Sequence, residues 1–457
     1  MAVITGAFLV MLTWLVGVLI VVSWGVLLAT LTSPGASRLT VLRRSLWWGL
    51  AVGVLIVTAL SLFLPLHSLT AALLLLGSAV FLGVPGWISW AKQSRGVRTS
   101  DPRRWALVAA LVIAQAYLSL AALGPVTGYD SGLYHLGAIK YATEFPALQG
   151  LSNLYGPLGY STAEFPLAAI FGNGPWATEG FRLVNGFILL LVAFDLVLRL
   201  MRRRLTPGTF VLITGVVAAW VPMIALSDFW VTSPSQDSPV LGLCLVSTAY
   251  LVDSMAQRAG YRANLTVALL AGLVIVMLRS TMAGYVIAFL VVAVLLLVRR
   301  ERGCGAGPAL RSFAPAAAIA VLSAAGIIWR DYLLSGWLLY PLSIHAFDVP
   351  WRAPDPTGLR EATLGFARDP ANMWESVSGW AWVPAWFSRL PHEWAFAEFT
   401  LLAVAAVALL VVAHRLIAAG RIWRLLLLSA VPSAVAVGIW WLASPPAFRF
   451  AWGPLFT

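Results

Sequence analysis

Three side chains that can take part in chemistry lie close together near residue 130. The stretch GYDSGLYHLGAIKY, residues 128–141, holds Asp130, His135 and Lys140 among glycines and tyrosines. A carboxylate can take a proton from a reacting hydroxyl, and imidazole and ammonium groups can donate hydrogen bonds to an anion. The pattern therefore indicates a binding or catalytic site for a polar ligand.

The residues after Asp130 predict a short helix that ends before Pro146, because small and apolar side chains recur three to four residues apart. We expect this helix to lie along the outer membrane surface. Asp130 would then be at the helix N-cap, a common structural position. An N-cap does not explain the neighbouring His135 and Lys140.

A second polar stretch follows, GLSNLYGPLGYSTAEFPLAA at residues 150–169. Its Gly, Pro, Asn and Tyr are typical of an irregular loop whose hydroxyl and amide groups face a ligand. Asn153, Tyr155 and Tyr160 are candidate ligand contacts. Ser161 and Glu164 match the S-x-x-E capping box, which is a structural interpretation.

The rest of the sequence is strongly apolar. Of its 457 residues 60% are hydrophobic and 11% charged, and the mean hydropathy is +0.88, whereas about a quarter of an ordinary globular chain is charged. We therefore expect an integral membrane protein. The net charge of +12 does not indicate a nucleic-acid partner, because the arginines occur in short clusters between apolar runs.

About twelve apolar runs are long enough for the roughly 20 residues that one bilayer crossing requires. Each must be a helix, because lipid offers no hydrogen bonds to a bare backbone. The first run lacks a basic n-region and a cleavage site, so we expect a retained span, and GPLFT at 453–457 resembles the start of another. The predicted fold is all-α, with a single transmembrane domain over residues 1–457. The runs lie near residues 4–30, 46–64, 69–90, 105–124, 181–201, 209–227, 239–256, 263–278, 281–298, 312–329, 395–413 and 425–442.

The arginine-rich loops determine the expected orientation. They all fall on one side if the spans alternate, and the positive-inside rule makes that side the cytoplasm. Two long segments, roughly 125–180 and 330–394, then lie outside. Within the spans the ionisable residues are chiefly Asp195, which Arg199 can neutralise one turn later, and Asp253.

Four stretches carry a family resemblance, which runs from about residue 125 to the end. They are YDSGLYHLGAIKYATEFPALQGLSNLYGPLGY from residue 129, SPSQDSP at 233–239, RDYLLSGWLLYP at 330–341 and PAFRFAWGPL at 446–455. Together they resemble an uncharacterised family of bacterial polytopic proteins regarded as members of the GT-C glycosyltransferase superfamily. On this resemblance, residues 105–457 form a GT-C-like core and residues 1–104 are additional N-terminal spans.

The resemblance implies an inverting glycosyltransferase of the bacterial cytoplasmic membrane. Such an enzyme takes a sugar from a polyprenyl-phosphate donor and transfers it, on the outer side, to a lipid-linked glycan, lipid or protein. GT-C enzymes carry an essential carboxylate between two surface-lying helices of the first large external loop, and Asp130 occupies that position. Two features depart from the pattern: three spans precede the one leading into the loop, and the paired acidic motif of many relatives is not obvious. Asp228 and Asp237 are the nearest external alternatives.

Transfer from such a donor requires few protein groups. A positioned carboxylate, expected to be Asp130, accepts the proton of the acceptor hydroxyl, and the departing phosphate needs a cation. Arg279, which interrupts an apolar run, and Arg330, at the top of an outward span, are the candidate cations, although Arg330 could instead snorkel to the lipid headgroups. The expected donor-binding set is completed by His135, Lys140, Asn153, Tyr155, Asp228 and Asp237.

No cofactor is expected. The histidines are scattered without the ligand spacing of a zinc site, and a divalent cation between Asp130 and Asp237 is the one metal hypothesis. The main alternative function is a flippase or transporter of lipid-linked saccharides. It would need a polar path between the helices, and the few ionisable residues in the spans count against it. A scaffold in a polysaccharide export complex would leave the polar loop unexplained.

Overall fold

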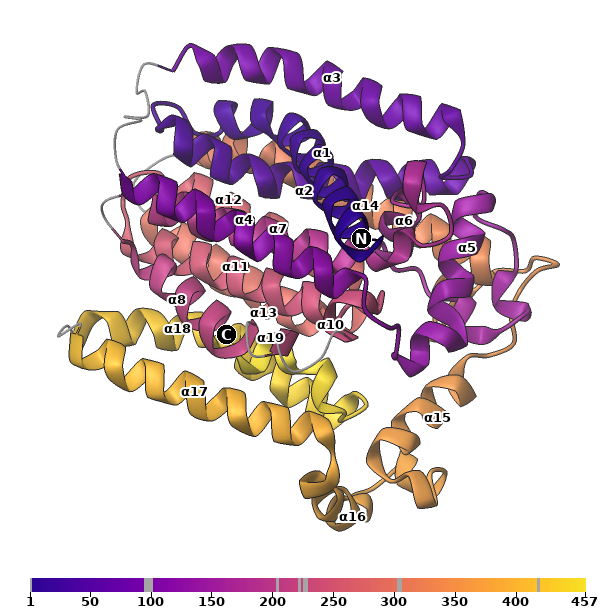
Figure 1. The fold of residues 1–457 in the computed structure, drawn as a ribbon. Coiled ribbons are helices and arrows are strands. Elements are labelled where there is room, and N and C mark those ends of the chain that lie inside the picture. The colour runs from indigo at the N-terminus through magenta and orange to yellow at the C-terminus, as the bar shows by residue number, and fades with distance from the viewer. Residues whose placement is uncertain are drawn as a thin grey trace.

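The computed structural model describes residues 2–93, 102–202, 205–220, 223–224, 229–301, 306–416 and 420–457. In these ranges the regular secondary structure is almost entirely helical (Figure 1). The α-helices are α1 (Ala2–Leu31), α2 (Arg38–Phe63), α3 (Leu69–Ala91), α4 (Pro102–Ala122), α5 (Leu136–Glu144), α6 (Glu164–Ile170), α7 (Val184–Leu200), α8 (Pro207–Gly215), α10 (Phe229–Thr232), α11 (Asp237–Ala256), α12 (Tyr261–Leu278), α13 (Ala283–Arg300), α14 (Ala306–Ser335), α15 (Thr357–Arg368), α16 (Trp382–Arg389), α17 (Trp394–Leu416), α18 (Gly420–Ala443) and α19 (Trp452–Leu455). The described residues also form one antiparallel hairpin of β1 (Trp337–Leu339) and β2 (Ile344–Ala346), with Trp337 opposite Ala346.

Nine helices within the described ranges are long and apolar enough to cross a membrane. Three further apolar segments, Pro207–Ala219, Phe396–Ala408 and Leu427–Ala443, are shorter than the roughly 20 residues of a typical crossing. All twelve coincide with predicted spans, so an all-α, multi-pass membrane protein is confirmed. The nine are Val3–Leu31, Arg38–Phe63, Leu69–Ala91, Pro102–Ala122, Gly180–Leu200, Asp237–Ala256, Tyr261–Leu278, Ser280–Arg300 and Arg311–Ser335.

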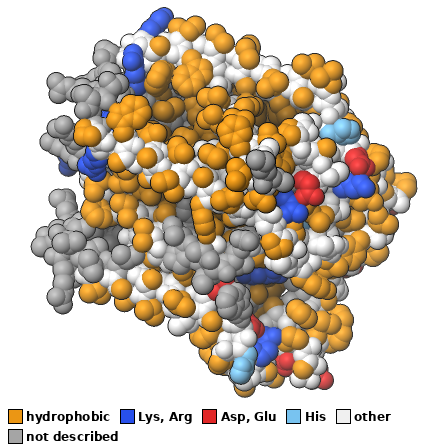
Figure 2. Space-filling view, viewed as in Figure 1, with side chains coloured by type: hydrophobic (Ala, Val, Ile, Leu, Met, Phe, Trp, Pro, Cys, Tyr) orange, Lys and Arg blue, Asp and Glu red, His pale blue; other side chains and the backbone are white. Residues whose placement is uncertain are grey.

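The helices divide into a buried centre and a lipid-facing periphery. In their most apolar stretches, 94% of the residues of α11 are buried, against 17% in α14. Large side chains on the outer helices, such as Phe8 on α1 and Phe81 on α3, are exposed. Hydrophobic side chains are spread over much of the described part of the face in Figure 2, and such a surface is stable in contact with lipid rather than water.

Two glycines allow α1 and α2 to pack with their backbones in close contact. A Cβ atom on Gly25 would lie 2.0 Å from the carbonyl oxygen of Ser45, and one on Gly49 would lie 1.7 Å from that of Val21. Neither position has room for a side chain. Close approach through small residues is a common way for helices to associate in membranes, where the hydrophobic effect cannot draw them together.

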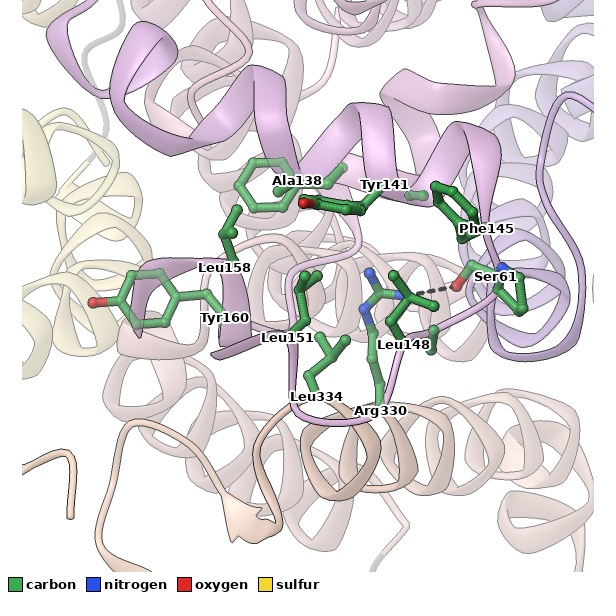
Figure 3. A pocket seen from close by; sticks show the side chains of 14 residues that line it. Ser61, Ala138, Tyr141, Phe145, Leu148, Leu151, Leu158, Tyr160, Arg330 and Leu334 are labelled. Atoms are coloured by element: carbon green, nitrogen blue, oxygen red, sulfur yellow. Dashed lines mark hydrogen bonds between the residues drawn. The ribbon is translucent and has the colours of Figure 1, made fainter. Parts of the chain in front are cut away.

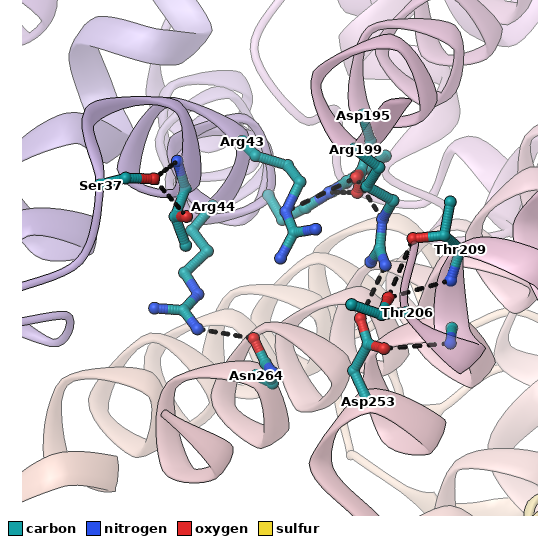
Figure 4. Close-up of polar contacts among 12 residues, drawn as sticks. Ser37, Arg43, Arg44, Asp195, Arg199, Thr206, Thr209, Asp253 and Asn264 are labelled. Carbon is teal, nitrogen blue, oxygen red and sulfur yellow. Dashed lines mark hydrogen bonds and ion pairs between the residues drawn. The ribbon is translucent and has the colours of Figure 1, made fainter. Parts of the chain in front are cut away.

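A buried ion network joins α7, α11 and α2 at one end of the bundle (Figure 4). The Arg199 guanidinium lies 2.7 Å from an oxygen of Asp195 and 2.7 Å from an oxygen of Asp253. Trp47 donates a 2.6 Å hydrogen bond to Asp195, and the backbone N–H of Gly208 donates to Asp253 at 3.0 Å. The predicted pairing of Asp195 with Arg199 is confirmed, and Asp253 joins it from another helix.

Replacing Arg199 by Met should destabilise the protein strongly, because it leaves Asp195 and Asp253 buried without their shared cation. Breaking a buried ion pair typically costs about 3–5 kcal/mol. Thermal or denaturant unfolding of the purified protein in detergent measures this loss. Arg360→Met is the control: Arg360 is exposed on α15, and its replacement should change stability by less than about 0.5 kcal/mol. Equal effects of the two substitutions would contradict the proposed importance of the network.

The connecting segments gather mainly at the opposite end of the bundle, which we call the Asp130 end. Helices α5, α6 and α15 and the β-hairpin lie on that side, and α16 lies below them at the bottom of the view (Figure 1). Helix α14 continues to Ser335, beyond the predicted span end, so Arg330 lies inside the helix and is only 5% exposed. Arg330 is therefore buried within the protein, and the snorkelling interpretation is wrong.

Candidate functional site

Asp130 forms an ion pair with an arginine from the far end of the chain. Its Oδ2 atom lies 2.7 Å from a terminal nitrogen of Arg449, and the two side chains are 26% and 33% exposed. Asp130 makes no capping hydrogen bond to the helix that follows it. Asp130 stands at the N-cap position, as predicted, but its side chain does not cap the helix, and it is a partly accessible carboxylate held by a guanidinium.

The backbone around Asp130 is held in place by a close contact with the segment before α11. Ser131 and Ser233 are joined by a 2.5 Å hydrogen bond between their hydroxyls. A Cβ atom on Gly128 would lie 2.6 Å from the Ser233 hydroxyl and 2.7 Å from that of Ser131, so a side chain there would have to displace this contact. From Ser131 to His135 the chain forms one turn of π-helix that continues into α5. The predicted short helix is confirmed, and it ends at Glu144, before Pro146.

A second ion pair lies next to the first. Asp237, the first residue of α11, pairs with Arg279, which directly follows the last residue of α12. Asn185 of α7 orders the segment before Asp237 by donating hydrogen bonds to the carbonyls of Ser233 at 2.7 Å and Ser235 at 2.9 Å. Asp237 is 2% exposed, so this pair is better shielded from solvent than Asp130 and Arg449.

The two pairs meet at one aromatic ring. The guanidinium carbon of Arg279 lies 5.3 Å from the centre of the Phe450 ring, and that of Arg449 lies 5.0 Å from it. Both distances are within the range of cation–π contact. We call Asp130, Asp237, Arg279 and Arg449 the four-charge cluster. Its members come from four separate parts of the sequence, and three of them, Asp130, Asp237 and Arg279, are predicted site residues.

His135 lies beside the cluster as a neutral side chain. Burial lowers the pKa of His135 to about 4, despite the opposing effect of Asp130 and Asp237. Its ring contacts Phe165 with centroids 5.4 Å apart and Tyr134 at 4.4 Å. The His135 Nδ1 atom is buried and has no hydrogen-bond partner in the described residues. His135 is thus a buried, uncharged side chain next to the ionised groups.

Glu164 is a further buried carboxyl group that the sequence analysis assigned to a capping box. The structure contradicts that interpretation, because α6 begins at Glu164 itself and neither carboxyl oxygen has a hydrogen-bond partner among the described residues. Hydrogen bonds from Thr162 to the Leu278 carbonyl, 2.6 Å, and from Ala163 to the Met277 carbonyl, 2.9 Å, hold the segment against the end of α12. Burial raises the pKa of Glu164 to about 8; Arg279 lowers it and Asp237 raises it further.

Glu164→Gln should remove a pH-dependent loss of stability. The pKa of Glu164 rises from an ordinary 4.5 to about 8 in the fold, so the folded state holds an extra proton between these values. The contribution of this proton to the free energy of unfolding is complete below about pH 4.5. It is lost as the pH rises toward 8, by on the order of 1 kcal/mol per pH unit. In thermal unfolding between pH 5 and pH 9, the Tm of the variant should increase relative to that of the wild type as the pH rises. A difference independent of pH would show that Glu164 is ionised throughout.

The other predicted residues lie apart from the four-charge cluster. Lys140 is exposed on α5. Asn153 is exposed and donates a 2.8 Å hydrogen bond to the Trp351 carbonyl, which ties the two long connecting segments together, and Tyr155 is 39% exposed. Arg330 lies in a separate pocket (Figure 3). Asp228 falls outside the described residues.

Arg449 is the functional candidate that sequence reasoning missed. It occurs in PAFRFAWGPL, one of the stretches that carry the resemblance, as a lone cation in an apolar run. Burial lowers its pKa, but Asp237 and Asp130 outweigh this effect and raise the pKa overall. Arg449 therefore stays cationic.

The described residues show no cluster of metal ligands that would support the metal hypothesis. Within the described ranges, no group of three or more His, Cys, Asp or Glu side chains is arranged to hold a metal ion. Asp130 and Asp237 each have an arginine partner. A divalent cation between these two carboxylates stays a hypothesis.

The fold and the site define an all-helical, multi-pass membrane protein with a cluster of paired charges at one end of its bundle. The chain belongs to the family described as a domain of unknown function (DUF8201), whose model matches residues 8–456. No curated protein and no solved structure matches it. The family match spans both the N-terminal helices and the helices that carry the four-charge cluster.

Proposed function

We propose that this protein is a membrane glycosyltransferase that moves a sugar from a polyprenyl-phosphate donor to a lipid-linked glycan, lipid or protein acceptor. The observation that carries the proposal is the four-charge cluster, in which the partly exposed carboxylate of Asp130 lies beside a guanidinium. The resemblance of the Asp130 stretch to GT-C enzymes supports the same reaction. The proposed setting is the bacterial cytoplasmic membrane, with about twelve crossings and the Asp130 end facing outward, in accord with the basic loops.

The cluster can supply what this transfer requires. The oxygen of an acceptor hydroxyl attacks the anomeric carbon of the donor, and its proton passes to the Asp130 carboxylate. The bond from the anomeric carbon to the phosphate oxygen breaks, the phosphate keeps the electron pair, and the configuration at the anomeric carbon inverts. Arg449 and Arg279 are the cations that can offset the charge on the departing phosphate.

Arg449 can couple donor binding to catalysis. In the structure its guanidinium is paired with Asp130, yet a third of the Arg449 side chain is exposed. A donor phosphate carries more than one oxygen that a guanidinium can bind, so it would compete with Asp130 for Arg449. Donor binding would then leave the Asp130 carboxylate available to accept a proton.

Uncharged neighbours strengthen these electrostatic interactions. With a pKa of about 4, His135 is neutral at pH 7, and with a pKa of about 8, Glu164 is mostly protonated. Buried neutral groups lower the effective dielectric constant and so increase the attraction between a phosphate and the arginines. Lys140, Asn153 and Tyr155, all exposed at the Asp130 end, are proposed to contact the sugar or the acceptor from outside.

The proposal is tested with purified full-length protein in liposomes. The substrate is a polyprenyl-phosphate sugar labelled in the sugar, and a membrane lipid extract provides acceptors. Transfer is measured as movement of the label to a new product with release of polyprenyl phosphate. The alternative, a flippase, would carry the labelled donor across the bilayer with its glycosidic bond intact. Translocation without release of the carrier would therefore overturn the proposed reaction.

A further inference from the structure

Arg330 lies in a small pocket that is separate from the four-charge cluster. The pocket is bounded by α5, by Ser61 of α2, by the segment from Pro146 to Tyr160 and by α14, and the Arg330 guanidinium lies at its centre (Figure 3). Its other walls are almost entirely apolar or aromatic. They include Tyr141, Phe145, Leu148, Leu151, Leu158 and Leu334.

Arg330 has no carboxylate within ion-pair distance among the described residues, although the next residue, Asp331, attracts its charge from farther away. The side chain is 95% buried, since only 5% of the residue is exposed. It donates a 2.9 Å hydrogen bond to the Ser61 hydroxyl, but its Nε atom has no partner, and in the described residues no carboxylate forms an ion pair with it. An unpaired buried cation is costly. Arg330 is therefore poised to bind an anion.

Hydrogen bonds to neighbouring helices hold the segment that forms one wall of the pocket. The Ala147 N–H donates to the Ser61 carbonyl at 2.9 Å, and the Gly150 N–H donates to the Leu333 carbonyl at 2.9 Å. The Ser152 hydroxyl donates to the Leu334 carbonyl at 2.8 Å. These bonds fasten the segment after α5 to both α2 and α14, so the walls around Arg330 are held in position.

The pocket also has a route to the surface and a second donor. Phe145 at its edge is 42% exposed, and Pro146, Ala147 and Leu148 are partly exposed. The Tyr141 side chain lines the pocket alongside Arg330 (Figure 3). An apolar rim around a guanidinium and a phenol hydroxyl suits an anionic group attached to an apolar molecule.

We propose that this pocket is a second anion site, which binds a phosphate group through Arg330 and the Tyr141 hydroxyl. A guanidinium presents several N–H donors in one plane, a geometry that matches phosphate oxygens. The phosphate belongs either to a lipid headgroup or to a free phosphate ester. The site goes beyond the proposed transfer reaction and does not depend on it.

Thermal unfolding in phosphate-free maltoside micelles tests the site. The probes are inorganic phosphate and short-chain phosphatidic acid, with short-chain diacylglycerol as the uncharged control. A ligand that binds only the folded state stabilises it by a factor of about 100 in the folding equilibrium when present at 100 times its Kd. We expect a saturable rise in Tm with at least one phosphate probe and none with diacylglycerol. A rise with phosphatidic acid alone identifies a lipid headgroup, and one with inorganic phosphate alone identifies free phosphate.

The variants separate a ligand site from a structural arginine. Because the four-charge cluster is itself proposed to bind a donor phosphate, this comparison is made in an Arg449→Met background, which weakens binding there. In that background Arg330→Met should abolish the rise, and the Tm of the unliganded protein should stay the same or increase, because an unpaired buried charge is removed. Tyr141→Phe should raise the half-saturating concentration about tenfold. Arg360→Met should leave the rise unchanged. Thermal unfolding does not depend on sugar transfer, so failure of this proposal and failure of the transfer reaction are distinguishable.

Two results would overturn the proposal. The first is the absence of a saturable rise with either phosphate probe in the wild type or in the Arg449→Met background, and the second is a rise that persists in that background after Arg330→Met. Should Arg330→Met not fold, Arg330→Lys takes its place. Lysine keeps the charge but loses the planar donor geometry, so an unchanged half-saturating concentration in Arg330→Lys would count equally against the site.

Discussion

Asp130→Asn should yield a folded protein whose rate of sugar transfer falls about a hundredfold to ten-thousandfold, the usual contribution of a general base. Asparagine keeps the size of the side chain and one acceptor oxygen, but it cannot take up the proton of the acceptor hydroxyl. Because the Asp130 and Arg449 side chains are 26% and 33% exposed, loss of their ion pair should change stability by less than about 1 kcal/mol. Transfer in liposomes and thermal unfolding are measured on the same preparation.

Asp348→Asn is the matched control for this prediction. Asp348 is an exposed carboxylate between β2 and α15, so it also lies in a long connecting segment but outside the four-charge cluster. Its replacement should leave both transfer and stability close to normal. Near-normal turnover in a stable Asp130→Asn protein would remove Asp130 from catalysis and make Asp237 the next candidate among the described residues.

Arg449→Met should lower the rate of transfer about a hundredfold to a thousandfold, the range seen when one group that stabilises a developing negative charge is removed. The side chain keeps much of its apolar contact with Phe450 and loses its charge. Because the ion pair with Asp130 is partly exposed, the fold should survive. Initial rates over a range of donor concentrations measure the effect on kcat and on KM separately.

Two further variants show how Arg449 acts. Arg360→Met, which removes an exposed guanidinium elsewhere at the Asp130 end, should have no effect on transfer. If Asp130 and Arg449 work as a unit, the double variant Asp130→Asn/Arg449→Met should be little slower than Asp130→Asn alone. Fully multiplied losses would mean that Arg449 acts on the donor without regard to Asp130. Normal transfer in Arg449→Met would exclude it from the reaction.

The helical elements could be predicted because their signals are local. Apolar runs of bilayer length occur where the structure has apolar helices, and Pro146 ends the helix after Asp130 as expected. The Asp195–Arg199 pair could also be predicted, since residues four apart lie on one face of a helix. Each of these features depends on a few neighbouring residues.

Local sequence patterns gave wrong predictions of side-chain contacts where a contact with another helix formed instead of the predicted helix cap. Ser161 and Glu164 have the spacing of a capping box, but hydrogen bonds to the end of α12 hold residues 162 and 163, and the helix begins only at Glu164. Asp130 stands at the N-cap position, but its side chain pairs with Arg449 instead of capping the helix. In both cases a tertiary partner stabilises the segment more than the local cap would.

By itself, the sequence determined that this is an all-α membrane protein with a polar stretch around Asp130, because apolar length and helical period are properties of adjacent residues. Only the tertiary structure decided which charges meet. Arg449 lies 319 positions from its partner Asp130, and no periodicity connects them. The tertiary structure also separated Arg330 from Arg279, two arginines of similar local context, because the packing of α5 and α14 buries one of them in a pocket of its own. Ion pairs between helices depend on which faces pack together, and that is a property of the whole bundle.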